Sequence, residues 1–248
     1  MLGAARDAGL DPIVHVSSYV ALLPPVDVLG EDSPVGDPRG VYARSKAETE
    51  QMARQLQDQG APVVITYPGM VWGPHDPYLG EAATFARSVL RGLVPMVPPG
   101  VLPIVDVREV AAAHAAVLTP GRGPRRYMLA GGIASLAELI DLMRRVTGRR
   151  LVRVTAPAPL VLGMTAAGDV VQRVLPFRLP FNFGGVWVAT HGGPVDASAT
   201  ERDLGVRFRP LEDSIADMLR WLHAAGQLTD RQAGRAAAPA PSPTLGAH

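Results

Sequence analysis

The chain has 248 residues, of which 47% are hydrophobic and 19% are charged, so it is long enough for one large α/β domain with an ordinary buried core. Its formal net charge of +1 gives no electrostatic reason to expect nucleic acid or an acidic membrane as a partner. The absence of cysteine excludes disulfides, thiolate catalysis and cysteine-bound zinc, and we predict no metal site.

Targeting and membrane signals are missing from the sequence. Its first residues lack the basic flank and apolar run of a signal peptide. Two stretches without charged residues, 154–168 and 179–195, are shorter than the roughly 20 residues that a membrane helix needs, and both contain proline and glycine. We therefore expect a cytoplasmic protein.

Hydrophobic periodicity and turn residues divide the first hundred residues into alternating strands and helices. In chain order, the pattern predicts a helix end at 2–10, a buried strand at 12–18, a long surface loop at 23–40, a helix at 41–59, a buried strand at 62–68, a turn at 69–74 and a helix at 81–91.

The second half of the chain continues this alternation. The pattern predicts a helix at 107–118 capped by Asp106, a strand at 127–130, a helix at 136–147 capped by Ser135, a strand at 151–155 and an amphipathic helix at 210–225. Residues 157–195 are apolar and rich in proline and glycine, and no element is assigned to them. Residues 229–248 have little to bury and are expected to be disordered. Alternating strands and helices predict a parallel sheet covered on both faces.

Tyr42 and Lys46 stand four residues apart in the helix predicted at 41–59. This spacing places both side chains on one face, one turn apart. A phenol titrates near ~10 in isolation, and a neighbouring ammonium stabilises the phenolate. The pair is therefore suited to proton exchange, although the spacing alone also occurs in solvent-exposed helices.

Two further groups of residues follow the predicted strands. Ser17 and Ser18 end the strand at 12–18, a position where α/β proteins place groups that bind ligands. Pro68, Gly69, Met70 and Val71 follow the next strand and form a turn.

The order of these motifs, together with the segments 104–110 and 196–205, resembles the extended short-chain dehydrogenase/reductase family, also called the epimerase/dehydratase family. The resemblance covers about residues 1–226. It implies the C-terminal part of a Rossmann-type doubly wound parallel sheet, with a partial NAD(P)-binding domain at 1–228. A small substrate-binding lobe would be built from about 75–100 and 150–200.

The resemblance also implies roles for individual residues. Tyr42 corresponds to the general acid/base, and Lys46 to the residue that lowers its pKa and holds the nicotinamide ribose. Ser18 corresponds to the serine that orients the reacting oxygen, with Ser17 as the alternative. The backbone of 68–71 corresponds to a contact with the nicotinamide, so the implied cofactor is NAD or NADP.

The sequence departs from the family in lacking the Gly-x-x-Gly-x-x-Gly turn that holds the cofactor pyrophosphate. By motif matching, residue 1 falls in the helix before the family's fifth strand, so four strand–helix units are absent. We therefore expect the strand at 12–18 to be an open, apolar sheet edge. We also expect the chain to be unstable or free of cofactor in isolation, through either a misplaced start codon or a gene fragment.

Two features favour an apolar small-molecule substrate over a nucleotide sugar. Tyr67 stands where many family members have arginine, and 157–195 contains no evident basic cluster for a diphosphate. That stretch instead contributes large apolar side chains, namely Phe177, Phe181, Phe183, Val186 and Trp187. His75 and Asp76 follow the Pro-Gly turn and are further candidates for lining the pocket.

The function that we predict is NAD(P)-dependent interconversion of an alcohol and a ketone or aldehyde, as in dihydroflavonol reductases and hydroxysteroid dehydrogenases. One alternative is a nucleotide-sugar epimerase or dehydratase. Another is an inactive fragment or regulatory binding protein without the glycine-rich loop. The resemblance also implies that two copies of the chain can form a homodimer through the helix that carries Tyr42 and Lys46.

Overall fold

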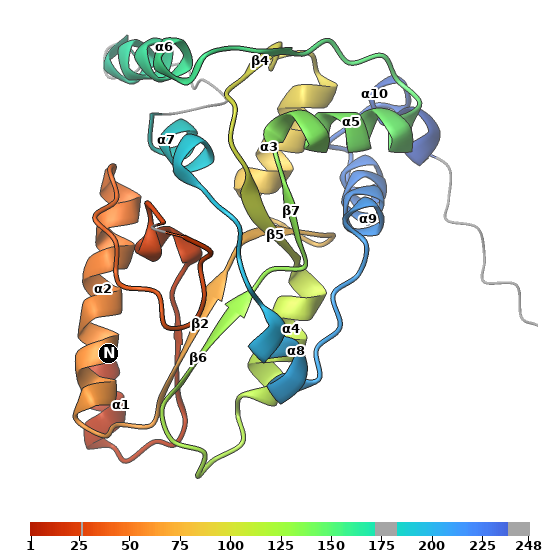
Figure 1. The fold of residues 1–248 in the computed structure, drawn as a ribbon. Coiled ribbons are helices and arrows are strands. Elements are labelled where there is room, and N and C mark those ends of the chain that lie inside the picture. Colours follow the sequence, from red (N-terminus) through yellow and green to blue (C-terminus); the bar gives the residue numbers. More distant parts are fainter. Residues whose placement is uncertain (26, 172–182, 238–248) are drawn as a thin grey trace, which may run out of the picture.

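The structure is a computed structural model that describes residues 1–25, 27–171 and 183–237. Its centre is a parallel sheet whose strands lie in the order β1, β2, β6 (Figure 1). The strands are β1 (Ile13–Val16), β2 (Val63–Pro68) and β6 (Arg125–Leu129). Every residue of β2 is buried, as expected for the middle strand of a sheet covered on both faces.

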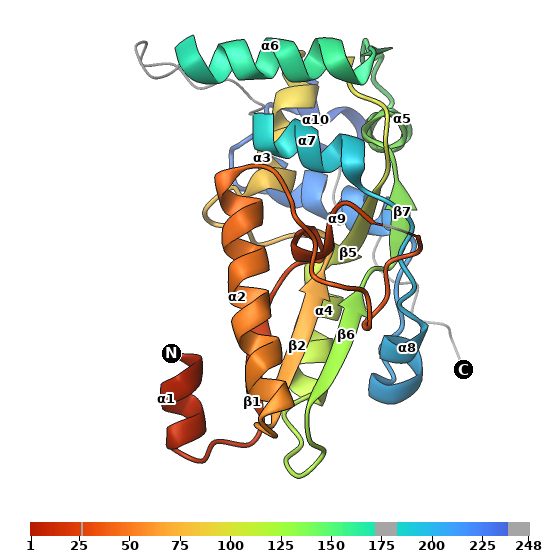
Figure 2. The same cartoon turned by 60° about the vertical axis from the view of Figure 1, so that its left-hand side comes forward.

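Helices cover both faces of this sheet, as Figures 1 and 2 show. Because side chains alternate along β2, Val63 and Ile65 pack toward α2 (Val41–Asp58), whereas Val64 packs with α4 (Val107–Ala116). The other two helices beside this sheet are α1 (Leu2–Asp7) and α8 (Ser198–Leu204). The α/β architecture predicted from the sequence is thus confirmed.

A second sheet continues from the first and carries its own helices. It contains β3 (Met70–Trp72), β5 (Leu102–Asp106) and β7 (Gly132–Ala134), with β7 antiparallel to β5. The accompanying helices are α3 (Glu81–Leu90), α5 (Leu136–Thr147) and α9 (Leu211–Ala224). The predicted caps are present, since Asp106 and Ser135 each form a capping box at the start of α4 and α5.

The segments around 75–100, 150–171 and 183–191 meet at one end of the molecule (Figure 1). There β4 (Met96–Val97) pairs with β8 (Val154–Thr155). Next to this pair, α6 (Ala158–Val171) packs on α7 (Phe183–His191). These two helices occupy much of the stretch to which the sequence pattern assigned no element.

Two segments that were expected to lack regular packing, the loop at 23–40 and the residues from Thr229, differ from this expectation. The segment predicted as a surface loop is preceded by a short 3-10 helix, η1 (Tyr19–Leu22), and buries both Leu23 and Leu29. Of the residues 229–248 that were expected to be disordered, 230–237 form α10 (Asp230–Ala233) and η2 (Gly234–Ala237), and 238–248 lie outside the described residues. The reason is packing, because Ala233 and Ala236 join the main core.

The strand β1 lies at an edge of the sheet, with β2 as its neighbour. Val16, the last residue of β1, remains 46% exposed. This placement agrees with the open edge expected from the sequence. Among the described residues, no helix is both long and apolar enough to cross a bilayer.

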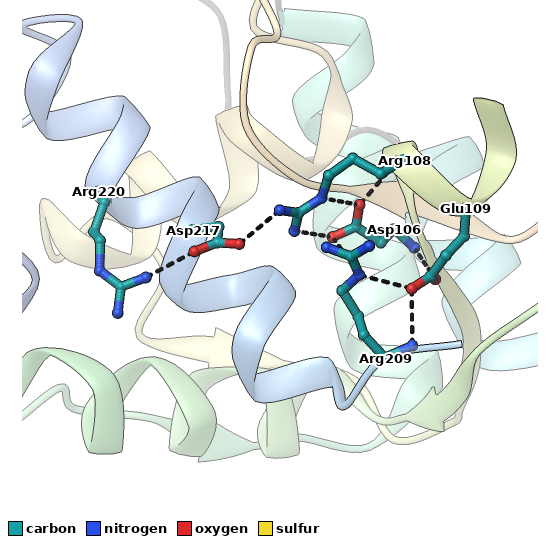
Figure 3. A network of polar contacts seen from close by, with 6 residues as sticks. All are labelled: Asp106, Arg108, Glu109, Arg209, Asp217 and Arg220. Atoms are coloured by element: carbon teal, nitrogen blue, oxygen red, sulfur yellow. Dashed lines mark hydrogen bonds and ion pairs between the residues drawn. The ribbon is translucent and has the colours of Figure 1, made fainter. Parts of the chain in front are cut away.

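A network of charged side chains joins the start of α4 to α9 and to the segment before it (Figure 3). Its centre is the buried carboxylate of Asp106, which lies 2.7 Å from the guanidinium of Arg108. Arg108 also pairs with Asp217 of α9, and Arg209 pairs with Glu109. The network fixes α9 against the end of β5.

Candidate functional site

A cavity of about 950 Å³ opens at the carboxyl ends of β1 and β2. Its walls come from the residues after β1, the first turn of α2, the turn after β2, the loop 73–80, and the helices α3 and α7. In a parallel sheet, loops at this edge converge on ligands. Of the eight residues predicted to act in catalysis or cofactor binding, five line it: Ser18, Tyr42, Gly69, Met70 and Val71.

Ser18 is held rigidly where β1 passes into η1. It is 8% exposed, and its Oγ accepts a hydrogen bond from the Val20 N–H at 3.4 Å. The neighbouring Ser17 is also buried, but it does not line the cavity. Its Oγ has no hydrogen-bond partner among the described residues. Of the two serines, Ser18 is therefore the one that faces the cavity.

Tyr42 lies in the first turn of α2 with 58% of its surface exposed. Its partial burial and the charge of Glu81 raise the pKa of the phenol, whereas a hydrogen bond with Ser18 lowers it. The net direction is opposite to the acidification that the Tyr-Lys spacing suggested. Glu81, which stands at the start of α3 and also lines the cavity, is a contributor that sequence reasoning missed.

Lys46 lies one helical turn beyond Tyr42 and reaches back to β1. Its Nζ donates to the carbonyl oxygen of Val16 at 3.2 Å and to that of Ser17 at 3.5 Å. The same atom is 5.9 Å from the centroid of the Tyr42 ring. Lys46 is thus beside the phenol and anchored to the sheet, although it does not itself line the cavity.

The turn after β2 brings backbone close to the cavity. Gly69 is buried, and its N–H donates to the Leu129 carbonyl at 3.0 Å. A Cβ on Gly69 would overlap the Pro103 carbonyl, whose carbon would be 2.7 Å away. Glycine is therefore required by close packing against β5. Pro68 is buried in β2 and does not line the cavity.

The loop after this turn is shaped by Asp76, whose carboxylate accepts from the N–H of Tyr78 at 3.2 Å and of Gly80 at 2.7 Å. His75 adopts a φ of 67°, and its ring packs edge-on against Trp221 with centroids 6.3 Å apart. His75 and Asp76 both line the cavity, as the sequence suggested. Tyr19 and Arg39 also line it, and no sequence motif pointed to them.

Tyr67 does not bear on substrate choice in the way expected from the sequence. Its side chain is fully buried and points toward α2, and it does not line the cavity. Its Oη donates to Glu50 at 2.6 Å and accepts from Arg54 at 3.0 Å. Tyr67 therefore serves the packing between β2 and α2.

The apolar stretch predicted to bind substrate is divided in the structure. Val186 lines the cavity, whereas Trp187 is buried and stacks on His191 with centroids 4.3 Å apart. Phe177 and Phe181 lie outside the described residues, and Phe183 packs against the main core.

Comparison with curated proteins identifies relatives that span most of the chain. The chain is 27% identical over 237 residues to sterol demethylase protein B of Methylococcus capsulatus, covering 92% of this chain and 71% of the relative. It is 34% identical over 237 residues to a ketoreductase of 4-hydroxy-2-methyl-3-oxo-4-farnesyl-3,4-dihydroquinoline-1-oxide from Stigmatella aurantiaca, covering 92% and 70%. A putative dihydroflavonol 4-reductase of Synechocystis is 28% identical over 235 residues, covering 91% and 68%.

Solved structures share the fold at lower identity. The UDP-glucose 4-epimerase of Bifidobacterium longum, in complex with NAD+ and UDP, matches with a TM-score of 0.67 at 19% identity, covering 91% of this chain and 68% of that one. The dTDP-glucose 4,6-dehydratase of Streptomyces venezuelae, with NAD bound, matches with a TM-score of 0.65 at 24% identity, covering 90% and 63%.

The model of one protein family matches residues 1–130, which include β1, α2, β2 and the residues that bring Ser18, Tyr42 and Lys46 together. With this match and with relatives that span nine-tenths of its length, the chain belongs to the NAD dependent epimerase/dehydratase family, the extended short-chain dehydrogenases/reductases.

Proposed function

We propose that the protein is an NAD(P)-dependent oxidoreductase that interconverts an apolar alcohol and the corresponding ketone or aldehyde. The observation that carries this proposal is the cavity of about 950 Å³, in which Ser18 and Tyr42 face a wall of mainly apolar side chains. The apolar lining includes Val20, Leu79 and Val188.

The residues near Tyr42 fit the nicotinamide end of the cofactor. An ammonium has three donors, and that of Lys46 gives two to the carbonyls of Val16 and Ser17, which leaves one N–H for a ribose hydroxyl. The buried Ser17 Oγ, without a partner among the described residues, is a second polar group at this place. The turn 69–71 lines the cavity together with Tyr42. The bound cofactor would supply or take up a hydride at the substrate carbon.

The chain's own residues would carry the proton and orient the substrate. Tyr42 donates a proton to the carbonyl oxygen during reduction and accepts it from the alcohol during oxidation. Ser18, held at the end of β1, hydrogen-bonds the same oxygen. Lys46 places its ammonium beside the Tyr42 ring and fixes the start of α2 to the end of β1.

The charges around the cavity support an uncharged substrate. The formally charged side chains of its described lining are one cation, Arg39, and two anions, Asp76 and Glu81. A net negative lining does not favour a diphosphate group. The names of relatives point the same way, since they include a putative dihydroflavonol reductase and a ketoreductase of a farnesylated quinoline. A nucleotide-sugar epimerase or dehydratase is the second candidate, favoured by the fold of the solved structures.

The test begins with binding and continues with turnover. NADH and NADPH are titrated by nicotinamide fluorescence, which separates failure to bind cofactor from choice of the wrong substrate. Oxidation of the preferred cofactor is then followed with aromatic and terpenoid ketones and with UDP-glucose. We expect turnover of the apolar ketones and none with UDP-glucose.

Substitution of Tyr42 tests whether its phenol transfers the proton. Tyr42→Phe is expected to lower kcat/KM by roughly 10²- to 10⁴-fold, the range for loss of a general acid/base. Tyr78→Phe is the matched control, because Tyr78 is 93% exposed and does not line the cavity. Conversion of UDP-glucose without turnover of ketones would replace the proposal with the second candidate. Absence of binding to either cofactor would point to an inactive or regulatory chain.

A further inference from the structure

The reacting residues of α2 belong to a longer polar row on one side of the helix. Tyr42, Lys46, Glu50 and Arg54 follow one another at intervals of four residues, so they lie along one side of α2. Glu50 is 0% exposed, which is rare for a glutamate and costly unless its oxygens are hydrogen-bonded. The row therefore contains a deeply buried anion one helical turn beyond the lysine.

Glu50 ties the helix to the central strand of the sheet. Its Oε1 accepts from the Oη of Tyr67 on β2 at 2.6 Å and from the Nε of Arg54 at 2.7 Å. Arg54 also donates to the Tyr67 Oη at 3.0 Å, which closes a ring of three side chains. Hydrogen bonds that involve a charged group are the stronger ones and fix direction as well as distance.

The second oxygen of Glu50 belongs to the same interface. Oε2 is buried and has no hydrogen-bond partner among the described residues, and the same holds for the Nε2 of His15 on β1. Burial lowers the pKa of His15, Glu50 raises it, and Lys46 lowers it, so the imidazole lies within electrostatic reach of both side chains. Glu50 is therefore placed where α2 crosses from β2 to β1, the strand whose carbonyls hold Lys46.

We propose that Glu50 is a positioning residue: held by Tyr67 and Arg54, it sets the rotation and axial position of α2 so that Tyr42 meets Ser18 and Lys46 meets the end of β1. This inference rests on the proposed function for its kinetic consequences. Glu50 touches no substrate and acts through the helix. Its side-chain length is the critical property, because a shorter carboxylate cannot reach Tyr67 without pulling α2 toward the sheet.

Two substitutions separate length from charge. Glu50→Gln keeps the reach and an oxygen that accepts from Tyr67, whereas Glu50→Asp keeps the charge and loses one methylene. We expect Glu50→Asp to lower kcat by roughly 10- to 100-fold with KM changed less than about 3-fold, as for displacement of a reacting group by about 1 Å. Glu50→Gln is expected to restore kcat to within about 3-fold of the wild type. Glu48→Asp, on the exposed side of the same helix, is the control and should not change kcat.

A second readout does not depend on turnover. The chain has five tyrosines, so ¹³C-tyrosine NMR resolves Tyr42, which Tyr42→Phe assigns. We expect Glu50→Asp to shift the Tyr42 resonance, and neither Glu50→Gln nor Glu48→Asp to do so. The melting temperature of each variant shows how much of any loss of kcat comes from unfolding of the protein.

Failure of this inference and failure of the proposed function give different results. If the wild-type protein reduces no ketone, the proposed function is wrong. The NMR resonance of Tyr42 in the Glu50 variants then tests by itself whether Glu50 positions Tyr42. If Glu50→Asp keeps both the wild-type kcat and the wild-type Tyr42 resonance, Glu50 does not position the pair. If Glu50→Gln is as impaired as Glu50→Asp, charge rather than reach matters, and the inference is equally overturned.

Discussion

Replacing Asp106 with asparagine is the sharpest test of the charge network in Figure 3. Asp106 is 2% exposed, and its carboxylate accepts from the backbone N–H and the Nε of Arg108, both at 2.8 Å. Arg209 lies 3.8 Å from the same carboxylate. Asparagine also caps helices well, so the substitution removes the charge and leaves the cap of α4 in place.

The magnitude follows from the pKa of Asp106. Burial by itself would raise this pKa, but the hydrogen bonds from Arg108 outweigh burial and lower it from 3.8 to about 2. Because one pKa unit corresponds to about 1.4 kcal/mol, the carboxylate contributes roughly 2 kcal/mol to folding. The folded-state pKa is depressed, so this contribution is full above pH ~5 and is lost as the pH falls through about 2. At pH ~3 about half of it remains.

Urea unfolding followed by tryptophan fluorescence measures the effect. We expect Asp106→Asn to lower the free energy of unfolding by roughly 2 kcal/mol at pH 7 and by about half as much at pH 3. Arg220→Ala, which removes a half-exposed partner of Asp217, is the control and should cost less than about 1 kcal/mol. A loss for Asp106→Asn that is the same at both pH values, or no loss at all, would show that the charge of Asp106 does not stabilise the fold.

Three further outcomes are expected. Glu81→Gln should lower the pKa of the Tyr42 phenol, because the charge of Glu81 contributes to raising it; an unchanged NMR titration of Tyr42 would contradict this. Gly69→Ala should lower the free energy of unfolding in urea by roughly 1–3 kcal/mol, because the added Cβ would overlap the backbone of Pro103. Gly132→Ala, which has open space around the added Cβ, is the control and should cost much less. Equal losses would show that close packing is not the cause. Val16→Lys should reduce aggregation measured by light scattering, since a charge on an exposed edge strand opposes strand pairing, and unchanged scattering would place the aggregating surface elsewhere.

Features that depend on neighbouring residues could be predicted from the sequence. The capping boxes at Asp106 and Ser135 involve side chains three residues apart, and both are present. The four-residue spacing of Tyr42 and Lys46 placed them on one side of a helix, and the placement of Ser18 at a strand end brought it to the same cavity. These signals are short in range, so a pattern of residue types is enough to find them.

Features that depend on distant residues could not be found in this way. Glu50 lies on the buried side of α2 with Ala47 and Ala53, where a glutamate is unusual. Its burial is offset by hydrogen bonds from Arg54 on the same helix and from Tyr67 on the next strand, and the contact with Tyr67 is not visible in the local pattern. The residues after Thr229 contain few large apolar side chains. Arg149 donates to the backbone of Gln232, and Arg235 donates to the backbone of Arg145. These bonds join parts of the chain that are more than 80 residues apart, and no local composition indicates them.

The polar row on α2 restricts how the length of this chain can change during evolution. One residue inserted between Lys46 and Glu50 would rotate the two halves of the helix by about 100° relative to each other. Tyr42 and Lys46 would then turn away from β1 while Glu50 remained bound to Tyr67. A deletion or insertion between positions 42 and 54 would therefore separate the reacting groups from their anchor. Loops such as 119–124, which carry no such row, are where relatives of this chain should differ in length.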